Sequence, residues 1–163
     1  MRIAVYPGSF DPITNGHIDL VRRSLAVFEK IVVAVAYNRD KDSALFRPEE
    51  RVEMIREVLK DLGERVFVDQ FEGLLVDYVK KMDSRVVIRG LRAVSDFEYE
   101  FQMAIMNSKL RPEIETLFMM TGESYFYINS RTVKEVASFG GDIRGLVPPI
   151  VLERLKGKFG LPR

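Results

Sequence analysis

A chain of 163 residues, of which 47% are hydrophobic and 30% charged, is long enough to bury the core of one domain, which we expect to span residues 1–163. Its formal net charge of +1 gives no field that would draw it onto nucleic acid or a membrane, so we expect neither as a partner. The absence of cysteine excludes a disulfide framework and a thiolate nucleophile, and it suits a cytoplasmic location. We expect no signal peptide and no membrane span, because no apolar run approaches the ~20 residues that a span needs.

The first nineteen residues predict a strand, a glycine-containing turn and a helix. Residues 2–6 form an apolar run typical of a buried strand, and we expect Pro7-Gly8-Ser9 to end it. Helical periodicity begins at Gly16, so a helix N-terminus and its backbone N–H groups lie beside the end of the strand, where anions bind. This place contains Ser9, Thr14, Asn15 and His17, the only histidine of the chain. The alternatives are that Thr14 is only a helix cap and that the lone histidine is structural.

Strands and helices alternate along the rest of the chain. Continuous apolar runs predict strands at 31–37, 66–68, 85–89 and 115–120, each buried on both faces. Helical periodicity predicts helices at 47–62, 74–81, 96–110, 130–138 and 149–156. This order indicates an α/β fold with a doubly wound, parallel, five-stranded sheet and helices on both faces, on which the helices after about residue 130 pack.

Polar side chains follow several of these strands. Ser9, Lys41, Arg89, Arg92 and the segment 123–131 would all lie at the carboxyl edge of the sheet, where α/β proteins bind ligands. The clustered charges Lys41, Arg89, Arg92 and Arg131 are basic although the chain is nearly neutral, and the planar fork of arginine suits phosphate. The pattern therefore favours a phosphate-rich ligand. The competing explanation is that loops are polar and that these are solvated surface cations.

Three stretches resemble the bacterial phosphopantetheine adenylyltransferases, which belong to the nucleotidyltransferase superfamily. Thr14-Asn15-Gly16-His17, preceded by Gly8-Ser9-Phe10-Asp11-Pro12, is similar to the (T/H)xGH element of the superfamily. Residues 88–100 (IRGLRAVSDFEYE) resemble the IRGLRxxxDFEYE segment of the family, and residues 128–135 partly resemble its ISSxxVKE element. The chain departs from the family at Asn129 and Arg131, where serines are usual, and at Asp42, where a second lysine often follows Lys41.

The resemblance implies a Rossmann-like fold and adenylyl transfer from ATP to 4′-phosphopantetheine, with dephospho-coenzyme A and pyrophosphate as products. It also implies Mg²⁺ bound mainly through the ATP phosphates, and a homohexamer. Two alternatives stay open: another small-molecule nucleotidyltransferase, such as one acting on nicotinate mononucleotide, and a non-catalytic nucleotide-binding module.

By resemblance, His17 stabilises the transition state, and four residues bind the acceptor: Ser9, Lys41, Leu75 and Arg89. Leu75 reads equally well as a core leucine. We expect no metal site made of protein groups alone, because Glu98 and Glu100 do not share a helix face. The residues implied in ATP binding are Ser9, Phe10, His17, Gly90, Leu91, Arg92, Glu100, Tyr125, Phe126, Tyr127, Ile128, Asn129, Ser130 and Arg131.

Overall fold

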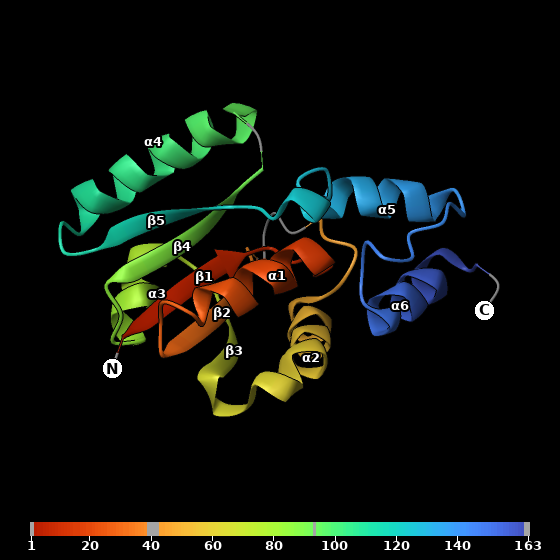
Figure 1. Cartoon of the computed structure of the whole chain (residues 1–163), viewed down its shortest axis with the longest axis horizontal. Coiled ribbons are helices and arrows are strands. Elements are labelled where there is room, and N and C mark those ends of the chain that lie inside the picture. Colours follow the sequence, from red (N-terminus) through yellow and green to blue (C-terminus); the bar gives the residue numbers. More distant parts are fainter. Residues whose placement is uncertain (1, 39–42, 93, 162–163) are drawn as a thin grey trace.

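A five-stranded, all-parallel sheet with the strand order β3-β2-β1-β4-β5 forms the centre of the molecule (Figure 1). The computed structural model describes residues 2–38, 43–92 and 94–161. Its strands are β1 (Ile3–Gly8), β2 (Lys30–Ala36), β3 (Val66–Phe71), β4 (Val86–Leu91) and β5 (Glu115–Met120). Its helices are α1 (Asn15–Ser24), α2 (Pro48–Leu59), α3 (Leu75–Lys81), α4 (Val94–Leu110), α5 (Ser130–Ser138) and α6 (Pro149–Phe159), with short 3₁₀ turns η1 (Lys60–Arg65) and η2 (Glu123–Tyr125).

Alternate residues of the central strands pack into two apolar clusters, one on each face of the sheet. Ala4 and Tyr6 of β1 join the cluster that contains side chains of α1, α2, α5 and α6. Val5, which lies between them, joins the cluster that contains side chains of α3. The predicted sheet with helices on both faces is therefore confirmed. Burial on both faces holds only for the inner strands, because β3 and β5 are edge strands with exposed positions.

Three strands, β1, β3 and β4, run further than the sequence predicts, and the expected end of β1 is wrong. β1 continues through Pro7 to Gly8, and both residues stay in register with β2. Pro7 has no N–H to donate, and it lies beyond Val5, the residue at which β1 pairs with β4; its carbonyl accepts a hydrogen bond from the Arg89 side chain at 2.7 Å. β4 extends to Leu91, past its predicted end at residue 89, and β3 extends to Phe71, past its predicted end at residue 68.

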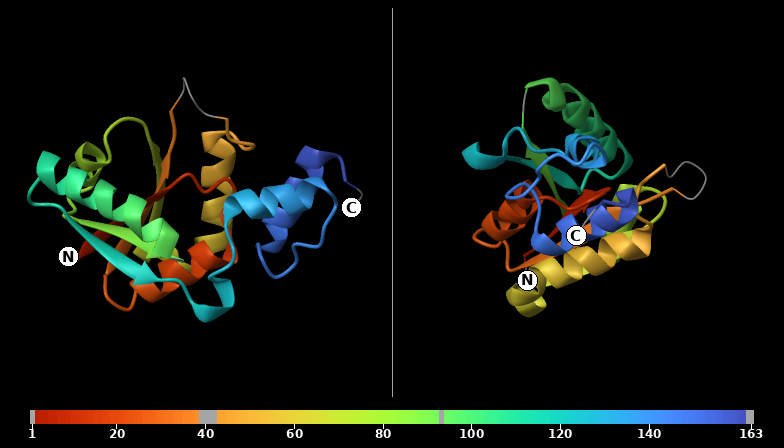
Figure 2. Two further views of the ribbon diagram at one scale, coloured as in Figure 1. Left: turned by 90° about the horizontal axis from the view of Figure 1, so that it is seen from above. Right: turned by 90° about the vertical axis from the view of Figure 1, so that its right-hand side faces the viewer.

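The two C-terminal helices lie next to each other beyond the carboxyl ends of the strands (Figures 1 and 2). Val133 and Ala137 of α5 and Leu155 of α6 are buried in the same cluster as β1 and α1. This packing holds the start of α5 against the edge of the sheet at which ligands were expected. In the described part of the chain, no helix has both the length and the apolar character that crossing a bilayer requires.

Gly90 is required by the close approach of β4 and α1. A Cβ at this position would lie 2.7 Å from Leu20 Cδ1, which is closer than carbon atoms pack. We predict that Gly90→Ala lowers the free energy of unfolding by about 1–3 kcal/mol, the usual cost of overpacking. Gly157→Ala is the control: it lies in the exposed part of α6 with no atom near its added Cβ, and it should stabilise by about 0.5–1 kcal/mol. Denaturant unfolding measures both; a Gly90→Ala variant as stable as the parent would contradict the assignment.

Candidate active site

A cavity of about 640 Å³ opens at the carboxyl edge of the sheet, between the ends of β1 and β4 and the first turns of α1 and α5. Its walls come from segments that are far apart in the sequence, as the predicted parallel sheet requires. Of the predicted site residues, the cavity brings together Ser9, Phe10, His17, Arg89, Gly90, Arg92, Glu100, Ile128, Asn129, Ser130 and Arg131. The expected meeting of His17 with both arginines in one cleft is therefore found.

His17 is held by the residue that caps its own helix. The backbone N–H of Thr14 donates to His17 Nδ1 at 3.0 Å, and the Thr14 hydroxyl oxygen accepts from the backbone N–H of His17 at 3.5 Å. Thr14 is thus a helix cap, as one of the two interpretations of this position predicts, and its backbone also orients the His17 ring. Because Nδ1 accepts a hydrogen bond, the proton of the neutral ring resides on Nε2. His17 therefore presents a neutral N–H donor at the cavity wall.

The surroundings of His17 keep its imidazole uncharged. Burial, followed by the positive charges of Arg92 and Arg89, lowers the pKa of His17 to about 4. At neutral pH the ring is therefore a hydrogen-bond donor without a charge of its own. Burial also raises the pKa of the Tyr6 hydroxyl, which keeps it protonated, and Tyr6 lies in the wall beside His17 with ring centroids 6.4 Å apart.

Arg89 forms a two-pronged ion pair with Glu100 that sequence reasoning did not predict. Arg89 Nε donates to Glu100 Oε2 at 2.6 Å and Nη2 donates to Oε1 at 2.5 Å, while Nη1 donates to the Pro7 carbonyl. The hydrogen bond and negative charge of Glu100 outweigh burial and raise the pKa of Arg89. The guanidinium is thus fixed in one orientation at the cavity wall. Glu100, expected beside ATP, contacts the arginine expected to hold the acceptor.

The first turn of α1 contains fewer unpaired donors than the sequence suggests. The Asn15 backbone N–H donates to the Leu146 carbonyl at 2.9 Å, and its side-chain amide donates to the Gly145 carbonyl at 2.7 Å. Asn15 therefore faces the segment before α6, and its expected place among the anion-binding groups is wrong. Asn129 caps α5, since its side chain accepts from the Thr132 backbone N–H at 2.8 Å, and Asn129 and the first residues of α5 line the cavity.

The ring of Phe10 packs against the imidazole of His17. Its backbone has φ = 47°, an unusual conformation for a bulky residue, and its ring packs edge-on against Tyr6 and His17 with centroid distances of 5.2 and 5.1 Å. A Cβ on Gly8 would lie 3.0 Å from this ring, so the glycine after Pro7 leaves the room that Phe10 needs. The Gly8-Ser9-Phe10 part of the motif therefore shapes the wall behind His17.

Several predicted residues lie outside the cavity, and several lining residues were missed. Lys41 and Asp42 lie outside the described residues. The residues absent from the lining are Leu75, Leu91, Tyr125, Phe126 and Tyr127. Sequence reasoning missed Tyr6, Tyr99 and Thr121. Thr121 directly follows β5, so the rule used for Ser9 could have identified it, whereas the other two give no such signal.

Acidic groups are sparse at this site. Among the described residues, no group of three or more His, Cys, Asp or Glu side chains could hold a metal ion, and Glu100 is the one carboxylate in the cavity lining.

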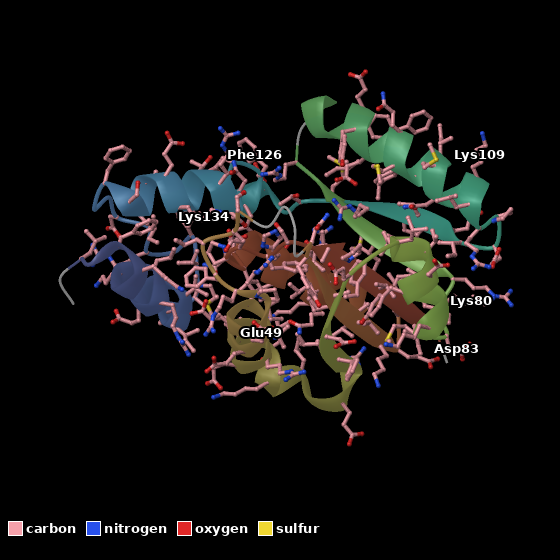
Figure 3. The ribbon with its side chains drawn as sticks, turned by 180° about the vertical axis from the view of Figure 1, so that it is seen from behind. Glu49, Lys80, Asp83, Lys109, Phe126 and Lys134 are labelled. Carbon is pink, nitrogen blue, oxygen red and sulfur yellow. The ribbon has the colours of Figure 1, made fainter. Side chains whose placement is uncertain are left out.

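A second hollow, of about 550 Å³, lies between α2 and β3 and carries Glu49, Glu53, Glu57 and Asp69; Glu49 is labelled in Figure 3. Its negative charge opposes phosphate, whereas the first cavity carries Arg89, Arg92 and Arg131.

Comparison with known proteins identifies the family. The cytidylyltransferase-like family matches residues 5–136. A phosphopantetheine adenylyltransferase of Geotalea daltonii is 59% identical over 159 residues, which are 98% of each chain. One of Geobacter metallireducens is 57% identical over 162 residues, 99% of this chain and 98% of the other. The chain belongs to the phosphopantetheine adenylyltransferase family. The matches span the three motifs and nearly everything between them.

A solved structure supports the fold independently of the phosphopantetheine adenylyltransferases. The nicotinic acid mononucleotide adenylyltransferase of Plasmodium falciparum, complexed with NaAD, superposes with a TM-score of 0.69. The alignment covers 98% of this chain and 96% of the other at 16% sequence identity. At this identity the likeness concerns the Rossmann-like fold alone.

The state of His17 is directly measurable because the chain has a single histidine. We predict that its ring titrates with a pKa of about 4 and that the neutral ring carries its proton on Nε2, since burial and two guanidinium groups oppose protonation. Nitrogen-15 NMR of the imidazole across pH 3–8 reports both. A pKa near the ordinary ~6.5, or a proton on Nδ1, would contradict the geometry described here.

Proposed function

We propose that this protein transfers the adenylyl group of ATP to 4′-phosphopantetheine and releases pyrophosphate and dephospho-coenzyme A, a step of coenzyme A biosynthesis. The observation that supports this proposal most directly is the oriented, neutral N–H donor of His17 in the same cavity as Arg89 and Arg92. Membership of the phosphopantetheine adenylyltransferase family supports this acceptor. The basic cavity suits a reaction in which two phosphate-bearing substrates must meet.

The chemistry needs positioning and charge stabilisation more than acid–base catalysis. An oxygen of the acceptor phosphate forms a bond to the α-phosphorus of ATP while the bond from that phosphorus to the α,β-bridging oxygen breaks, and this oxygen leaves with pyrophosphate. The attacking phosphate is already anionic at pH 7, so no group must remove a proton. His17 Nε2–H donates to a non-bridging oxygen of the α-phosphate, where negative charge develops, and keeps its proton throughout. No covalent protein intermediate forms.

The two substrates occupy different ends of the cavity in this proposal, and both extend past its lining, the acceptor to Leu75 and ATP to Leu91 and residues 125–127. Ser9, Lys41 and Arg89 hold the acceptor phosphate, and Leu75, at the start of α3 after the carboxyl end of β3, contacts the pantetheine arm. Glu100 acts on the acceptor side by orienting Arg89. ATP lies against Phe10, residues 90–92 and residues 125–131, with the first turn of α5 at its phosphates.

Mg²⁺ accompanies ATP in this proposal. The donor set does not fit a site built by the protein alone, because Glu100 is bound by Arg89 and the other lining groups are neutral or basic. Mg²⁺ keeps several waters and binds readily through phosphate oxygens. The triphosphate and water therefore supply its ligands, and the protein holds the complex through its phosphates.

We also propose a homo-oligomer, a homohexamer by family resemblance, whose contacts include α4 and β5. These elements leave large apolar side chains exposed, which in a lone protomer would face water. They are Phe97, Phe101, Ile105, Met106 and Leu110 of α4, with Leu117 and Met120 of β5. A cytoplasmic location stays a prediction from the cysteine-free sequence.

The function is tested by incubating the purified protein with ATP, Mg²⁺ and 4′-phosphopantetheine. Dephospho-coenzyme A and pyrophosphate should form in equal amounts, and nicotinate mononucleotide should give no product. Turnover with nicotinate mononucleotide alone would assign a different acceptor. ATP binding without turnover on either acceptor would indicate a non-catalytic module.

We predict that His17→Ala lowers kcat by about 10²–10³-fold, the range found when one transition-state hydrogen-bond donor is removed. The dissociation constant for ATP should change little, because the bond strengthens as charge develops in the transition state. Steady-state kinetics and calorimetry measure the two quantities. An unchanged kcat with a raised KM would refute the role of His17.

Glu100→Gln tests whether this residue serves the acceptor through Arg89. The variant loses one charge-assisted hydrogen bond to the guanidinium, so we expect the acceptor KM to rise about tenfold while the ATP KM stays within about twofold. Asp77→Asn is the matched control, because it breaks the surface pair with Arg111 and leaves the cavity untouched. If instead the ATP KM rises and the acceptor KM does not, Glu100 belongs to the ATP side.

A further inference from the structure

Asp11 lies inside the Gly8–Pro12 segment that precedes the Thr14–His17 motif, yet it does not line the cavity. Its side chain is buried, with 4% of the residue exposed. One carboxylate oxygen accepts the backbone N–H of Phe46 and the other accepts that of Leu45, each at 2.9 Å. The ammonium group of Lys134, on α5, donates a hydrogen bond to the same carboxylate. A buried charge that is this fully satisfied fixes its partners in place.

The partners of Asp11 belong to the two substrate-binding sides of the proposed site. Leu45 and Phe46 end the segment between β2 and α2, the segment that also contains Lys41. Lys134 lies one turn along α5 from Ser130 and Arg131, which line the cavity. Figure 3 shows Lys134 on the inner side of α5, away from the outer side on which Phe126 lies.

A second contact joins the same segments. The Ser130 hydroxyl donates to the Pro12 carbonyl at 2.7 Å, so the residue after Asp11 holds the first residue of α5. The ion pair is partly shielded from water, with 28% of the Lys134 side chain and 5% of the Asp11 side chain exposed, which limits screening. Removing either partner leaves the charge of the other without its ion pair in a place that is partly shielded from water.

We propose that Asp11 and Lys134 form a positioning pair that fixes the phosphate-binding turn of α5 relative to the segment that carries Lys41. The proposal deepens the function proposed above and rests on it. Neither residue touches substrate; Asp11 acts through the Leu45 and Phe46 amides on one side, and through Lys134 on the other. The pair thereby sets the spacing at which the triphosphate and the acceptor phosphate meet.

The two residues should differ in which substrate they affect. Loss of the Lys134 ammonium releases α5 and leaves the Leu45 and Phe46 bonds in place, so it should weaken ATP alone. Asp11→Asn loses more, because an amide NH₂ cannot accept the second backbone N–H. It should therefore weaken both substrates.

The test compares Lys134→Met with Lys156→Met. Lys156 of α6 makes a lysine–carboxylate pair with Glu153, its side chain is 29% exposed, and it does not line the cavity. We expect Lys134→Met to raise the ATP KM and the ATP dissociation constant on the order of tenfold, because displaced positioning groups lose binding and rate. The acceptor KM should stay within about twofold, and Lys134→Arg should recover most of the loss, since arginine keeps the charge. Lys156→Met should change neither constant.

Equal constants for Lys134→Met and the parent, or parallel rises for both substrates, would overturn the proposal. Asp11→Asn adds a readout that needs no turnover: faster amide hydrogen exchange at Leu45 and Phe46, with the exchange of core strand β2 unchanged. Unchanged exchange at those two amides would also overturn it. If the parent protein forms no dephospho-coenzyme A, the proposed function fails, while calorimetric ATP binding and amide exchange still decide the positioning pair.

Discussion

The hydrogen bond from the Thr14 backbone N–H to His17 Nδ1 is the interaction on which the rest of the site depends. It orients the ring, and it places the proton of the neutral imidazole on Nε2. A side chain oriented in advance loses no freedom when a phosphate arrives, so its hydrogen bond is available in full as charge develops. The bond uses a backbone donor of the N-cap residue, so helix α1 and the orientation of His17 form together.

The basic side chains of the cavity differ in their charge: Arg89 and Arg92 are charged, whereas His17 is neutral at neutral pH. Arg89 is neutralised and oriented by Glu100, whereas the pKa of His17 is lowered by burial and by the charges of Arg92 and Arg89. The neutral histidine donor shares the cavity with Arg89 and Arg92, so the positive charge of the site comes from the arginines and the histidine contributes a hydrogen bond. The same arrangement makes the protonation of His17 insensitive to changes near neutral pH.

The sequence predicts the sheet, its helices and the edge at which His17 meets Arg89 and Arg92, because apolar runs and strand ends are local patterns. It does not predict the partners of those side chains. The Arg89–Glu100 pair joins a strand to a helix, and the Asn15 contacts join α1 to residues 145–146, so both depend on tertiary packing. The predicted end of β1 is wrong for the same reason: Pro7 and Gly8 stay in register with β2, a pairing with a segment distant in sequence. The sequence predicts that Tyr6 belongs to a buried strand; Tyr6 is buried, and its ring also forms part of the cavity wall.

The most direct measurement is a crystal structure with 4′-phosphopantetheine and an ATP analogue in which a methylene group replaces the α,β-bridging oxygen. If His17 donates to the transferred group, a non-bridging oxygen of the α-phosphate will lie about 2.7–3.2 Å from Nε2, with the acceptor phosphate beside Arg89. An α-phosphate bound outside this cavity, or an imidazole turned so that Nε2 faces protein, would contradict the proposed role of His17.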